Sequence, residues 1–318
     1  MLFRGLRVLA ALPLAILLAL ALPGASLAQP SGGNPVEFNA VDESTGKGVG
    51  LRGMLWLPPG AAKGAVVLLH GAGGWNDFRE GHYGRELSAA GYAVLAVDSF
   101  GPRGVGPNLP HYRISFAQMA RDAFAARSLL IERGFAPQRM AVMGLSKGGT
   151  AALYAADRAL LAGQADRFPV AVVLYPPCHI RARVPSPASR VFMGLGEKDD
   201  LTGVKQCQEI AHAYEAAGGK VVVKLYADAA HGFDGNPANT TPFYASGVER
   251  FTECTVIVEA DGQESHAGKT YAVAGGEAII ADMRKSCIKT GASFWTNARQ
   301  KEAVIRDVVD FLNQALTS

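Results

Sequence analysis

The sequence predicts an α/β protein with a doubly wound, mostly parallel β-sheet. Short apolar runs recur along the chain, and segments of helical character separate them. The runs lack the strict alternation of a half-exposed strand, a pattern typical of strands buried on both faces of a parallel sheet. Because strands and helices alternate, we expect crossover connections with helices on both faces of the sheet.

The strands are expected to begin with an antiparallel hairpin. β-forming residues over Val36–Val41 and Val49–Leu57 flank the turn-rich segment DESTGKG. The apolar runs expected to follow in the sheet are Ala65–His70, Tyr92–Asp98, Met140–Leu145, Val170–Tyr175, Val191–Gly196 and Val221–Tyr226. The expected helices are Gly84–Ala90, Phe116–Arg133, Gly148–Leu161, Val204–Ala217 and Arg299–Leu316.

The N-terminal residues have the composition of a secretory signal peptide. Two arginines precede the apolar run Val8–Leu22, and small residues up to Ala28 form a cleavage-type site. Pro13 interrupts the run and Pro23 ends it, and the run is shorter than a membrane span requires. We expect residues 1–28 to be removed and residues 29–318 to be exported to the periplasm or the extracellular space, without further membrane contact. An uncleaved anchor is the alternative.

The length of the chain limits the number of domains, and its charge bears on whether it binds nucleic acid. The 318 residues, less the leader, fit one large α/β domain or two small ones. The formal net charge of +3 reflects 31 basic and 28 acidic residues, and no basic run or basic face with interleaved aromatic residues occurs. We therefore expect no nucleic-acid partner. The sequence leaves the oligomeric state open.

Four cysteines in an exported chain predict two disulfides. Close pairs such as CxxC are missing from the sequence, so we expect no metal site built on cysteines. Of the three possible pairings, Cys178 with Cys207 and Cys254 with Cys287 closes two separate loops. We expect this pairing.

One segment interrupts the alternation of strands and helices. Residues 235–297 are rich in Asn, Thr, Gly and charged residues, and they contain the second cysteine pair. The segment is either a solvated insertion held by its disulfide or a cap beside the mouth of the site. The sequence leaves both interpretations open, and we treat residues 29–318 as one domain that contains the segment.

The segment MAVMGLSKGGTAALYAA contains the strongest chemical signal. It predicts a strand, a sharp turn that holds Ser146, and a helix that begins with small residues. In a GxSxG turn the serine hydroxyl stands above the sheet, and Gly144 and Gly148 allow neighbouring elements to approach closely. The helix N-terminus directs N–H groups at the same place and favours an oxyanion. We predict that Ser146 is a nucleophile; a helix-capping serine is the alternative.

A serine hydroxyl is a weak nucleophile and needs an adjacent base. Of the seven histidines, His231 is the best candidate, because DAAHGFDG directly follows a predicted strand at the C-terminal edge of the sheet. His70 ends a buried strand and is expected to shape the HGAGG turn by hydrogen bonding. His179 also follows a strand but adjoins a cysteine, and we expect it to line the substrate pocket.

The base needs an acid that orients it, and hydrolases with this turn order the three residues as Ser, acid and His along the chain. The loop GEKDDLTG follows a predicted strand between the serine and the histidine and offers two adjacent aspartates. Adjacent side chains point in different directions, so one of them meets the histidine. We predict that Asp199 does, and that Asp200 caps the helix that begins near Thr202. Asp234, close to the histidine in sequence, is interpreted as a turn residue.

A tetrahedral intermediate carries a negative oxygen that needs preorganised donors. The backbone N–H of Lys147, directly after the nucleophile, is one expected donor, and the loop HGAGG supplies the other. The small residues of this loop leave room for a carbonyl oxygen, and we assign the second donor to Ala72. The Lys147 side chain is expected to face solvent.

Together these residues resemble the dienelactone hydrolase family of α/β hydrolases. The resemblance extends from Val49 to Phe233 and over the terminal helix. The segments VDSFGPRG and YPPC, with the DD pair and the cysteine of GEKDDLTGVKQC, are similar to an exported branch of the family. The resemblance implies cleavage of an ester or lactone without a cofactor. The namesake enzymes carry a cysteine at the position of Ser146, so the resemblance indicates the reaction class rather than dienelactone as the substrate.

Two loops are expected to border the pocket and its small-molecule ester or lactone. Trp75 of HGAGGWND is interpreted as an apolar wall of the acyl site or as a residue that packs under the insertion. Arg103 of FGPRG either binds a substrate carboxylate with both guanidinium edges or holds its loop through an ion pair. An acyl- or oligopeptidase of the same fold and a non-catalytic binding protein are the alternative functions.

Overall fold

A computed structural model describes residues 32–316, apart from 107–110, 162 and 272–275. The expected signal peptide, residues 1–28, lies outside the described residues. In the part of the chain that the structure describes, no helix has the length and apolar character needed to cross a bilayer.

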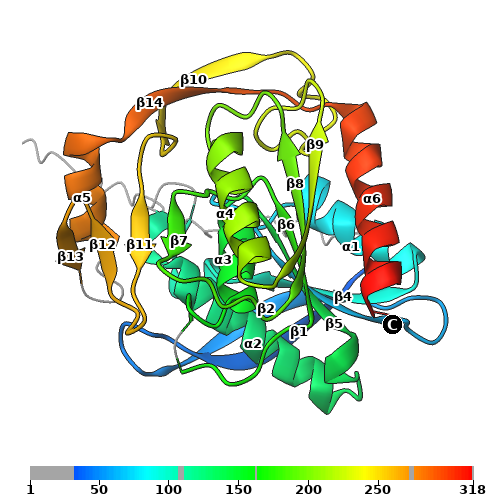
Figure 1. The fold of residues 1–318 in the computed structure, drawn as a ribbon. Helices are drawn as coiled ribbons and strands as arrows, with labels where there is room; N and C mark the ends of the chain where they lie inside the picture. Colours follow the sequence, from blue (N-terminus) through cyan, green and yellow to red (C-terminus); the bar gives the residue numbers. More distant parts are fainter. Residues whose placement is uncertain (1–31, 107–110, 162, 272–275, 317–318) are drawn as a thin grey trace, which may run out of the picture. The chain divides into compact units, whose positions relative to one another are not determined.

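An eight-stranded sheet with the order β1-β2-β4-β3-β5-β6-β8-β9 forms the centre of the structure (Figure 1). Its strands are β1 (Asn34–Val41), β2 (Gly48–Trp56), β3 (Gly64–Leu69), β4 (Tyr92–Asp98), β5 (Met140–Leu145), β6 (Val170–Leu174), β8 (Arg190–Gly196) and β9 (Lys220–Tyr226). β1, β2 and β4 pair antiparallel, and the pairs from β4 to β9 are parallel. The predicted sheet, with an antiparallel hairpin at its start, is confirmed.

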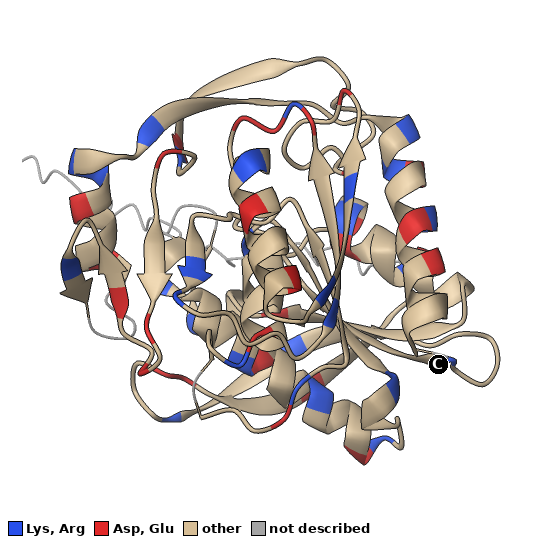
Figure 2. Ribbon diagram, in the orientation of Figure 1, with Lys and Arg blue, Asp and Glu red and all other residues tan. Residues whose placement is uncertain are grey.

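Helices cover both faces of the sheet because its central strands are apolar on both sides. Along β3, Ala65, Val67 and Leu69 belong to one buried cluster, whereas Val66 and Leu68 belong to the other. The first cluster is covered by α2 (Phe116–Glu132), α3 (Lys147–Ala156) and α4 (Val204–Ala216), and the second by α1 (His82–Ala89) and α6 (Ala298–Leu316). Figure 2 shows charged residues on the helices and outer strands, and β3, β5 and β6 contain none.

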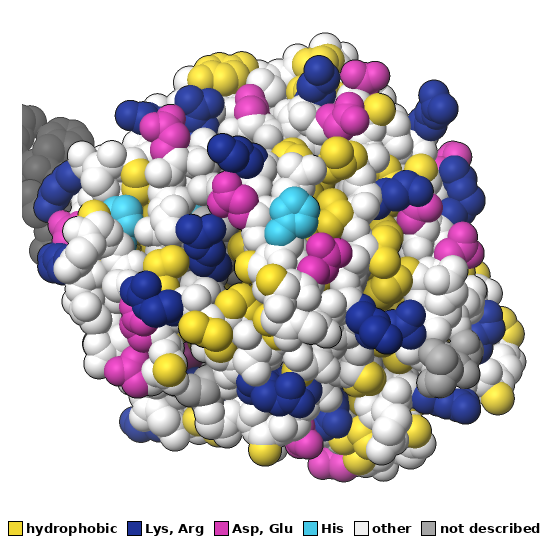
Figure 3. All heavy atoms as spheres, viewed as in Figure 1, with side chains coloured by type: hydrophobic (Ala, Val, Ile, Leu, Met, Phe, Trp, Pro, Cys, Tyr) yellow, Lys and Arg dark blue, Asp and Glu magenta, His cyan; other side chains and the backbone are white. Residues whose placement is uncertain are grey.

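The apolar sequence of β9 predicted a strand buried on both faces, but the structure shows that β9 is partly exposed. It forms an edge of the sheet, and its Val222, Val223 and Leu225 are 48%, 36% and 41% exposed. Figure 3 shows hydrophobic side chains on this face of the molecule among acidic and basic ones. Lys220 and Lys224 on β9 are the kind of residue that protects an edge strand from pairing with another chain. The apolar run indicated a strand but not its place in the sheet.

α3 ends at Ala156, earlier than the predicted end at Leu161. Asp157 adopts an extended backbone, and its side chain accepts hydrogen bonds from the N–H groups of Ala159 and Ser186 at 2.8 and 2.9 Å. An aspartate that bonds nearby backbone in this way competes with continuation of a helix. The helical pattern beyond Ala156 is therefore overridden locally.

The insertion, residues 235–297, has regular structure of its own. It contains β10 (Phe243–Arg250), β11 (Val256–Val258), β12 (Glu264–His266), β13 (Lys269–Tyr271), α5 (Gly276–Ser286) and β14 (Lys289–Phe294). β10 and β14 form an antiparallel ribbon that runs from α5 toward α6 in Figure 1. β11 pairs in parallel with β7 (Ile180–Ala182), which comes from outside the insertion. The pairing of β7 with β11 attaches the insertion to the rest of the fold.

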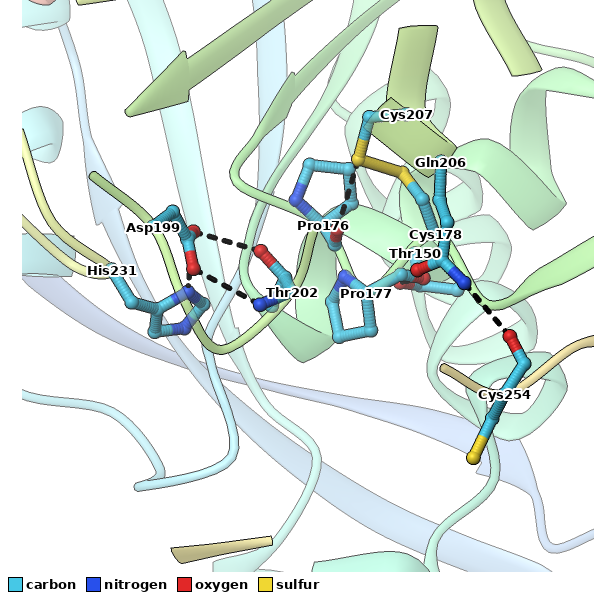
Figure 4. The surroundings of a disulfide bond; sticks show 10 residues. All are labelled: Thr150, Pro176, Pro177, Cys178, Asp199, Thr202, Gln206, Cys207, His231 and Cys254. Atoms are coloured by element: carbon cyan, nitrogen blue, oxygen red, sulfur yellow. Dashed lines mark hydrogen bonds and ion pairs between the residues drawn. A yellow bond between two sulfur atoms is a disulfide. The ribbon is translucent and has the colours of Figure 1, made fainter. Parts of the chain in front are cut away.

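The two disulfides have the predicted pairing. Cys178–Cys207 joins the loop after β6 to α4, close to the loop of Asp199 (Figure 4). Cys254–Cys287 joins the segment before β11 to the residue after α5, so it closes the insertion on itself. Crosslinks of this kind stabilise a fold mainly by restricting its unfolded chain.

Arg103 holds its loop through ion pairs, which confirms one of the two interpretations that the sequence left open, and it is not among the residues that line the cavity, so the substrate-binding interpretation is wrong. Its two terminal nitrogens each donate to a carboxylate oxygen of Asp122 at 2.8 Å. Its Nε lies 3.3 Å from Asp42, and Nη1 also donates to the carbonyl of Ser99. With the side chain of Arg103 only 5% exposed and that of Asp122 fully buried, the guanidinium is fully occupied by the protein.

The bend between β5 and α3 leaves no room for a side chain at two positions. A Cβ on Gly144 would overlap the backbone of Gly148, and a Cβ on Gly148 would lie 2.6 Å from the carbonyl oxygen of His70. Backbone atoms cannot turn aside as a flexible side chain can. Glycine at both positions therefore lets α3 begin in contact with the end of β3.

Replacement of Arg103 by Leu should destabilise the protein by about 3–5 kcal/mol, because it leaves the buried Asp122 carboxylate without its partner. Urea unfolding followed by circular dichroism measures this. Arg52→Leu is the matched control, since Arg52 is 61% exposed and 3.8 Å from Asp98, and exposed pairs contribute at most about 1 kcal/mol. Equal losses in the two variants would contradict a structural function of the Arg103 pair.

Gly148→Ala should lower the free energy of unfolding by about 1–3 kcal/mol, the usual cost of overpacking, because the added methyl group meets fixed carbonyl oxygens. The same urea titration measures the change. Gly60→Ala is the control: its Cβ would meet nothing within 4 Å, and we expect a change within about 0.5 kcal/mol. Wild-type stability of Gly148→Ala would show that the bend can relax.

Candidate active site

A cavity of about 1040 Å³ lies at the C-terminal ends of β3 and β5. The loops that follow these strands line one side of it, including Ala72 and Ser146. Residues of the insertion, among them Phe251, Val258 and Met283, line another. Open α/β sheets bind their ligands at this edge.

Ser146 occupies the bend between β5 and α3 in a strained conformation. Its φ of 50° and ψ of −117° fall in a region that residues with a Cβ rarely adopt. Its backbone N–H donates to the carbonyl of Leu174, which fixes the bend against β6. The strain projects the hydroxyl into the cavity instead of letting it cap the helix, since Ser146 makes no side-chain cap hydrogen bond to α3.

His231 lies between Ser146 and Asp199, in the loop after β9. Its Nε2 is 2.8 Å from the Ser146 hydroxyl oxygen, and its Nδ1 is 2.9 Å from a carboxylate oxygen of Asp199. A carboxylate accepts, so Nδ1 carries the proton and Nε2 is free to accept from the serine. The structure thus brings together the three residues that the sequence singled out, in one line of hydrogen bonds.

Asp199 is held by its own loop as well as by the histidine. It accepts hydrogen bonds from the N–H groups of Leu201 and Thr202 and from the Thr202 hydroxyl. Figure 4 shows those from Thr202. Burial favours the neutral acid, but the charge of His231 and the hydrogen bonds from His231 and Thr202 outweigh it and lower the pKa of Asp199. The carboxylate therefore stays ionised beside the imidazole.

Asp200 does not cap α4, which corrects the expectation for this residue. Its carboxylate accepts a hydrogen bond from the backbone N–H of Ser293 in β14 at 2.9 Å. α4 begins at Val204 without a side-chain cap, and the local turn is closed by Asp199. The second aspartate of the pair therefore connects this loop to the insertion.

His70 shapes the loop after β3, as its position in the sequence predicted. The N–H of Ser99 donates to Nε2 at 3.2 Å, so Nδ1 carries the proton and donates to the carbonyl of Gly71 at 2.7 Å. Burial lowers the pKa of His70, which keeps this neutral form. The backbone N–H groups of Ala72 and Lys147 have no acceptor among the described residues, and both residues line the cavity.

The Lys147 side chain is buried and does not face solvent as expected. The residue is 5% exposed and lines the cavity, with Nζ 4.7 Å from the centroid of the Phe116 ring. Burial lowers its pKa to about 7, against a weaker raising effect of the Glu43 charge. The sequence showed a lysine after the nucleophile but not the aromatic ring of α2 that packs against its ammonium.

His179 lines the cavity, as predicted, whereas Trp75 does not. The His179 ring stacks on Phe251 with centroids 4.6 Å apart, and burial, with repulsion from Lys147, lowers its pKa to about 3. Trp75 packs against the buried cluster on the α6 face of the sheet and is not among the residues that line the cavity. Its assignment as a wall of the acyl site is therefore corrected.

The sequence suggested that Asp234 is an ordinary turn residue. The structure shows instead that Asp234 is buried and supports the site through hydrogen bonds. It is fully buried and accepts hydrogen bonds from the hydroxyls of Tyr83 and Tyr175 at 2.7 and 2.6 Å. Burial and the Asp234 charge raise the pKa of both tyrosines, so their hydroxyls remain donors. Tyr175 packs edge-on against His231, with ring centroids 5.0 Å apart. The one feature of the sequence that could have indicated this role of Asp234 was its nearness to His231.

The chain was compared with known protein families, curated proteins and solved structures. Residues 51–253 match the dienelactone hydrolase family. No curated protein matches the chain. Among solved structures, esterase 2 of Thermogutta terrifontis, phosphoramylated by tabun, is 19% identical, with a TM-score of 0.48 over 66% of this chain and 88% of its own. The acylaminoacyl peptidase of Pyrococcus horikoshii is 14% identical, with a TM-score of 0.47 over 63% of this chain and 38% of its own.

The family match runs from Leu51 in β2 to Glu253 in the insertion, just beyond β10, so it includes the bend that holds Ser146 and the loops of Asp199 and His231. The predicted α/β-hydrolase fold is confirmed by the sheet order and by the crossover helices on both faces. The chain belongs to the dienelactone hydrolase family.

Proposed function

We propose that the protein is a serine hydrolase that cleaves carboxylic esters or lactones through an acyl-enzyme on Ser146. The observation that carries the proposal is the line of hydrogen bonds from the Ser146 hydroxyl through His231 to Asp199. It lies at the wall of a cavity large enough for a small-molecule substrate. Nucleophile, base and orienting acid are the parts that acyl transfer requires.

The reaction begins with proton transfer from Ser146 to Nε2 of His231 as the serine oxygen attacks the ester carbonyl. Asp199 holds the Nδ1 proton and stabilises the imidazolium that forms. The N–H groups of Ala72 and Lys147 donate hydrogen bonds to the negative tetrahedral oxygen, with the N-terminus of α3 behind them. The intermediate collapses, and the imidazolium returns the proton to the leaving alcohol.

Water then hydrolyses the acyl-enzyme with the same groups in reverse. His231 takes a proton from the water as its oxygen attacks the acyl carbonyl. The second tetrahedral intermediate releases the acid, and His231 protonates the Ser146 oxygen. The cycle consumes one ester and one water and gives one acid and one alcohol.

The insertion is proposed to act as a cap over this site. Phe251, Val258, Ile279 and Met283 of the insertion all line the cavity that Ser146 borders. Their side chains supply apolar surface opposite the nucleophile, so they shape the space left for the acyl or alcohol group. The sequence left open whether the insertion is a solvated segment or a cap. A cap explains why residues of the insertion line the cavity.

Export with removal of residues 1–28 remains part of the proposal. Two disulfides support it, because such bonds form and persist in oxidising compartments such as the periplasm and the extracellular space.

A peptidase of the same fold and a binding protein with a silent site are the rival functions. Turnover of matched ester and amide substrates with the same acyl group separates an esterase from a peptidase. Covalent labelling by a fluorophosphonate, which requires an activated serine, separates both enzymes from a binding protein.

Ser146→Ala should lower kcat/KM for p-nitrophenyl butyrate by at least about 10³-fold and abolish fluorophosphonate labelling, because it removes the attacking oxygen. Initial rates, and intact mass after labelling, measure the two effects. Ser44→Ala is the control, since Ser44 also borders the cavity but its hydroxyl bonds only Asp42 among the described residues. Retained turnover in Ser146→Ala would overturn the proposed function.

Asp199→Asn should lower kcat by about 10³- to 10⁴-fold, because an amide cannot hold the histidine in the correct tautomer. Asp200→Asn changes the adjacent residue in the same way, but its side chain bonds Ser293 and not the base. We expect a much smaller loss of kcat for Asp200→Asn. Equal losses in the two variants would contradict the assignment of Asp199 as the orienting acid.

A further inference from the structure

The loop that follows β6 supports the base of the site. Its first residue, Tyr175, packs edge-on against His231, with ring centroids 5.0 Å apart, and its hydroxyl donates to Asp234 at 2.6 Å. Tyr175 has a φ of 39°, and its backbone N–H donates to the carbonyl of Gly194 in β8 at 2.7 Å. A residue with a Cβ keeps such a conformation only where its surroundings hold it. The start of this loop is therefore fixed by its contacts.

The same loop is bonded to the helix that follows the nucleophile. The Thr150 hydroxyl on α3 donates to the carbonyl of Pro177 at 2.9 Å. The backbone N–H of Ser146 donates to the carbonyl of Leu174, the last residue of β6. The chain around the end of β6 thus contacts both the bend of the nucleophile and the base.

The turn that carries the acid is less firmly connected to the helix after it. Asp199 accepts hydrogen bonds from the N–H groups of Leu201 and Thr202 and from the Thr202 hydroxyl. Gly203 follows with a φ of 78°, and among the described residues no side chain caps α4, which begins at Val204. Glycine has wide conformational freedom at such a position. The first turn of α4 therefore needs another contact to fix it against the turn of Asp199.

The Cys178–Cys207 disulfide makes that contact. Cys207 lies in the first turn of α4, and Cys178 lies three residues after Tyr175 (Figure 4). Both cysteines are buried, with 3% and 0% of their surface exposed. One covalent bond thus joins the loop that supports His231 to the helix that follows Asp199.

We propose that Cys178 and Cys207 are positioning residues. Their disulfide keeps the carboxylate of Asp199 aligned with His231. The inference rests on the proposed function, in which Asp199 orients the base. Without the bond, α4 can shift and draw Thr202 away from Asp199, and the carboxylate then loses two of the hydrogen bonds that hold it against the imidazole. The disulfide thus acts on the rate of the reaction as well as on stability.

The second disulfide is a matched control. Cys254 and Cys287 are also buried, and the two bonds have similar sequence separations, 29 and 33, so their removal is expected to cost similar stability. Cys287 lies before the first residue of β14, whereas Phe294, which contacts His231, is its last. Gln206 on α4 donates to the backbone carbonyl of Cys254, and alanine keeps this acceptor. The second disulfide therefore closes the insertion without joining the supports of acid and base.

The test compares the double variants Cys178→Ala/Cys207→Ala and Cys254→Ala/Cys287→Ala on p-nitrophenyl butyrate. The first should lower kcat by about 10- to 100-fold, a loss typical of a small misplacement in an active site. The second should keep the wild-type kcat and raise KM, because it loosens only the insertion. Urea unfolding should show similar losses of stability in both. An unchanged kcat in the first variant, or equal losses of kcat in both, overturns the proposal.

NMR spectroscopy measures the alignment without a substrate. A histidine Nδ1 proton that is bonded to a carboxylate gives a resonance far downfield of the other protons, and Asp199→Asn identifies it by its loss. The resonance should be lost or broadened in Cys178→Ala/Cys207→Ala and kept in Cys254→Ala/Cys287→Ala. A resonance that persists unchanged in the first variant shows that the acid is still aligned and overturns the proposal.

A third measurement covers a first variant that does not fold. In folded Cys254→Ala/Cys287→Ala, a water-soluble phosphine reduces the remaining disulfide, and intact mass after alkylation counts the two thiols. The kcat should fall on reduction and return when oxidised glutathione restores the bond. An undiminished kcat in protein with two free thiols contradicts the positioning function.

Failure of the inference is distinguishable from failure of the proposed function. Ester hydrolysis together with an NMR resonance that does not depend on the disulfide means that only the positioning inference fails. A disulfide-dependent resonance in a protein that hydrolyses no ester and resists fluorophosphonate means that the hydrolase function fails, while the disulfide still aligns the acid.

Discussion

The close approach of backbone at the bend between β5 and α3 is the constraint on which the site depends. Gly144 and Gly148 have no space for a Cβ, and this lets α3 begin against the end of β3. The same contact forces Ser146 into its strained conformation and sets the N–H of Lys147 beside the loop of Ala72. Nucleophile and proposed oxyanion donors are thus positioned by backbone geometry before any side chain is considered.

Asp199 and Lys147 are two buried charged residues near this bend, and their surroundings differ. Asp199 loses its hydration but gains the imidazole and three hydrogen bonds from Leu201 and Thr202, so it remains an anion. Lys147 loses its hydration and gains the face of an aromatic ring and a weaker attraction from the Glu43 charge, so burial lowers its pKa. An opposite charge at close range and hydrogen bonds account for the difference, because they favour the charged form that burial alone disfavours.

Sequence predicted the features that local patterns encode and missed those that depend on packing. The strands, the bend at Ser146 and the partners His231 and Asp199 follow from apolar runs and from the strand ends that face one edge. The exposure of β9 did not follow, because an edge strand and a central one can share a composition. Arg103 was left open and Lys147 was misplaced for one reason: their partners, Asp122 and Phe116, lie on α2 and are distant in sequence.

The two adjacent aspartates after β8 have different partners, which the sequence could not assign. Asp199 takes its hydrogen bonds from its own loop and from His231, so its alignment does not depend on the insertion. Asp200 bonds Ser293 in β14, which with the β7 and β11 pairing anchors the insertion over the cavity. β14 also reaches the base, because its Phe294 packs edge-on against the His231 ring with centroids 6.1 Å apart. The insertion therefore contacts both Asp200 and the base, whereas the orienting carboxylate of Asp199 is held by hydrogen bonds from its own loop.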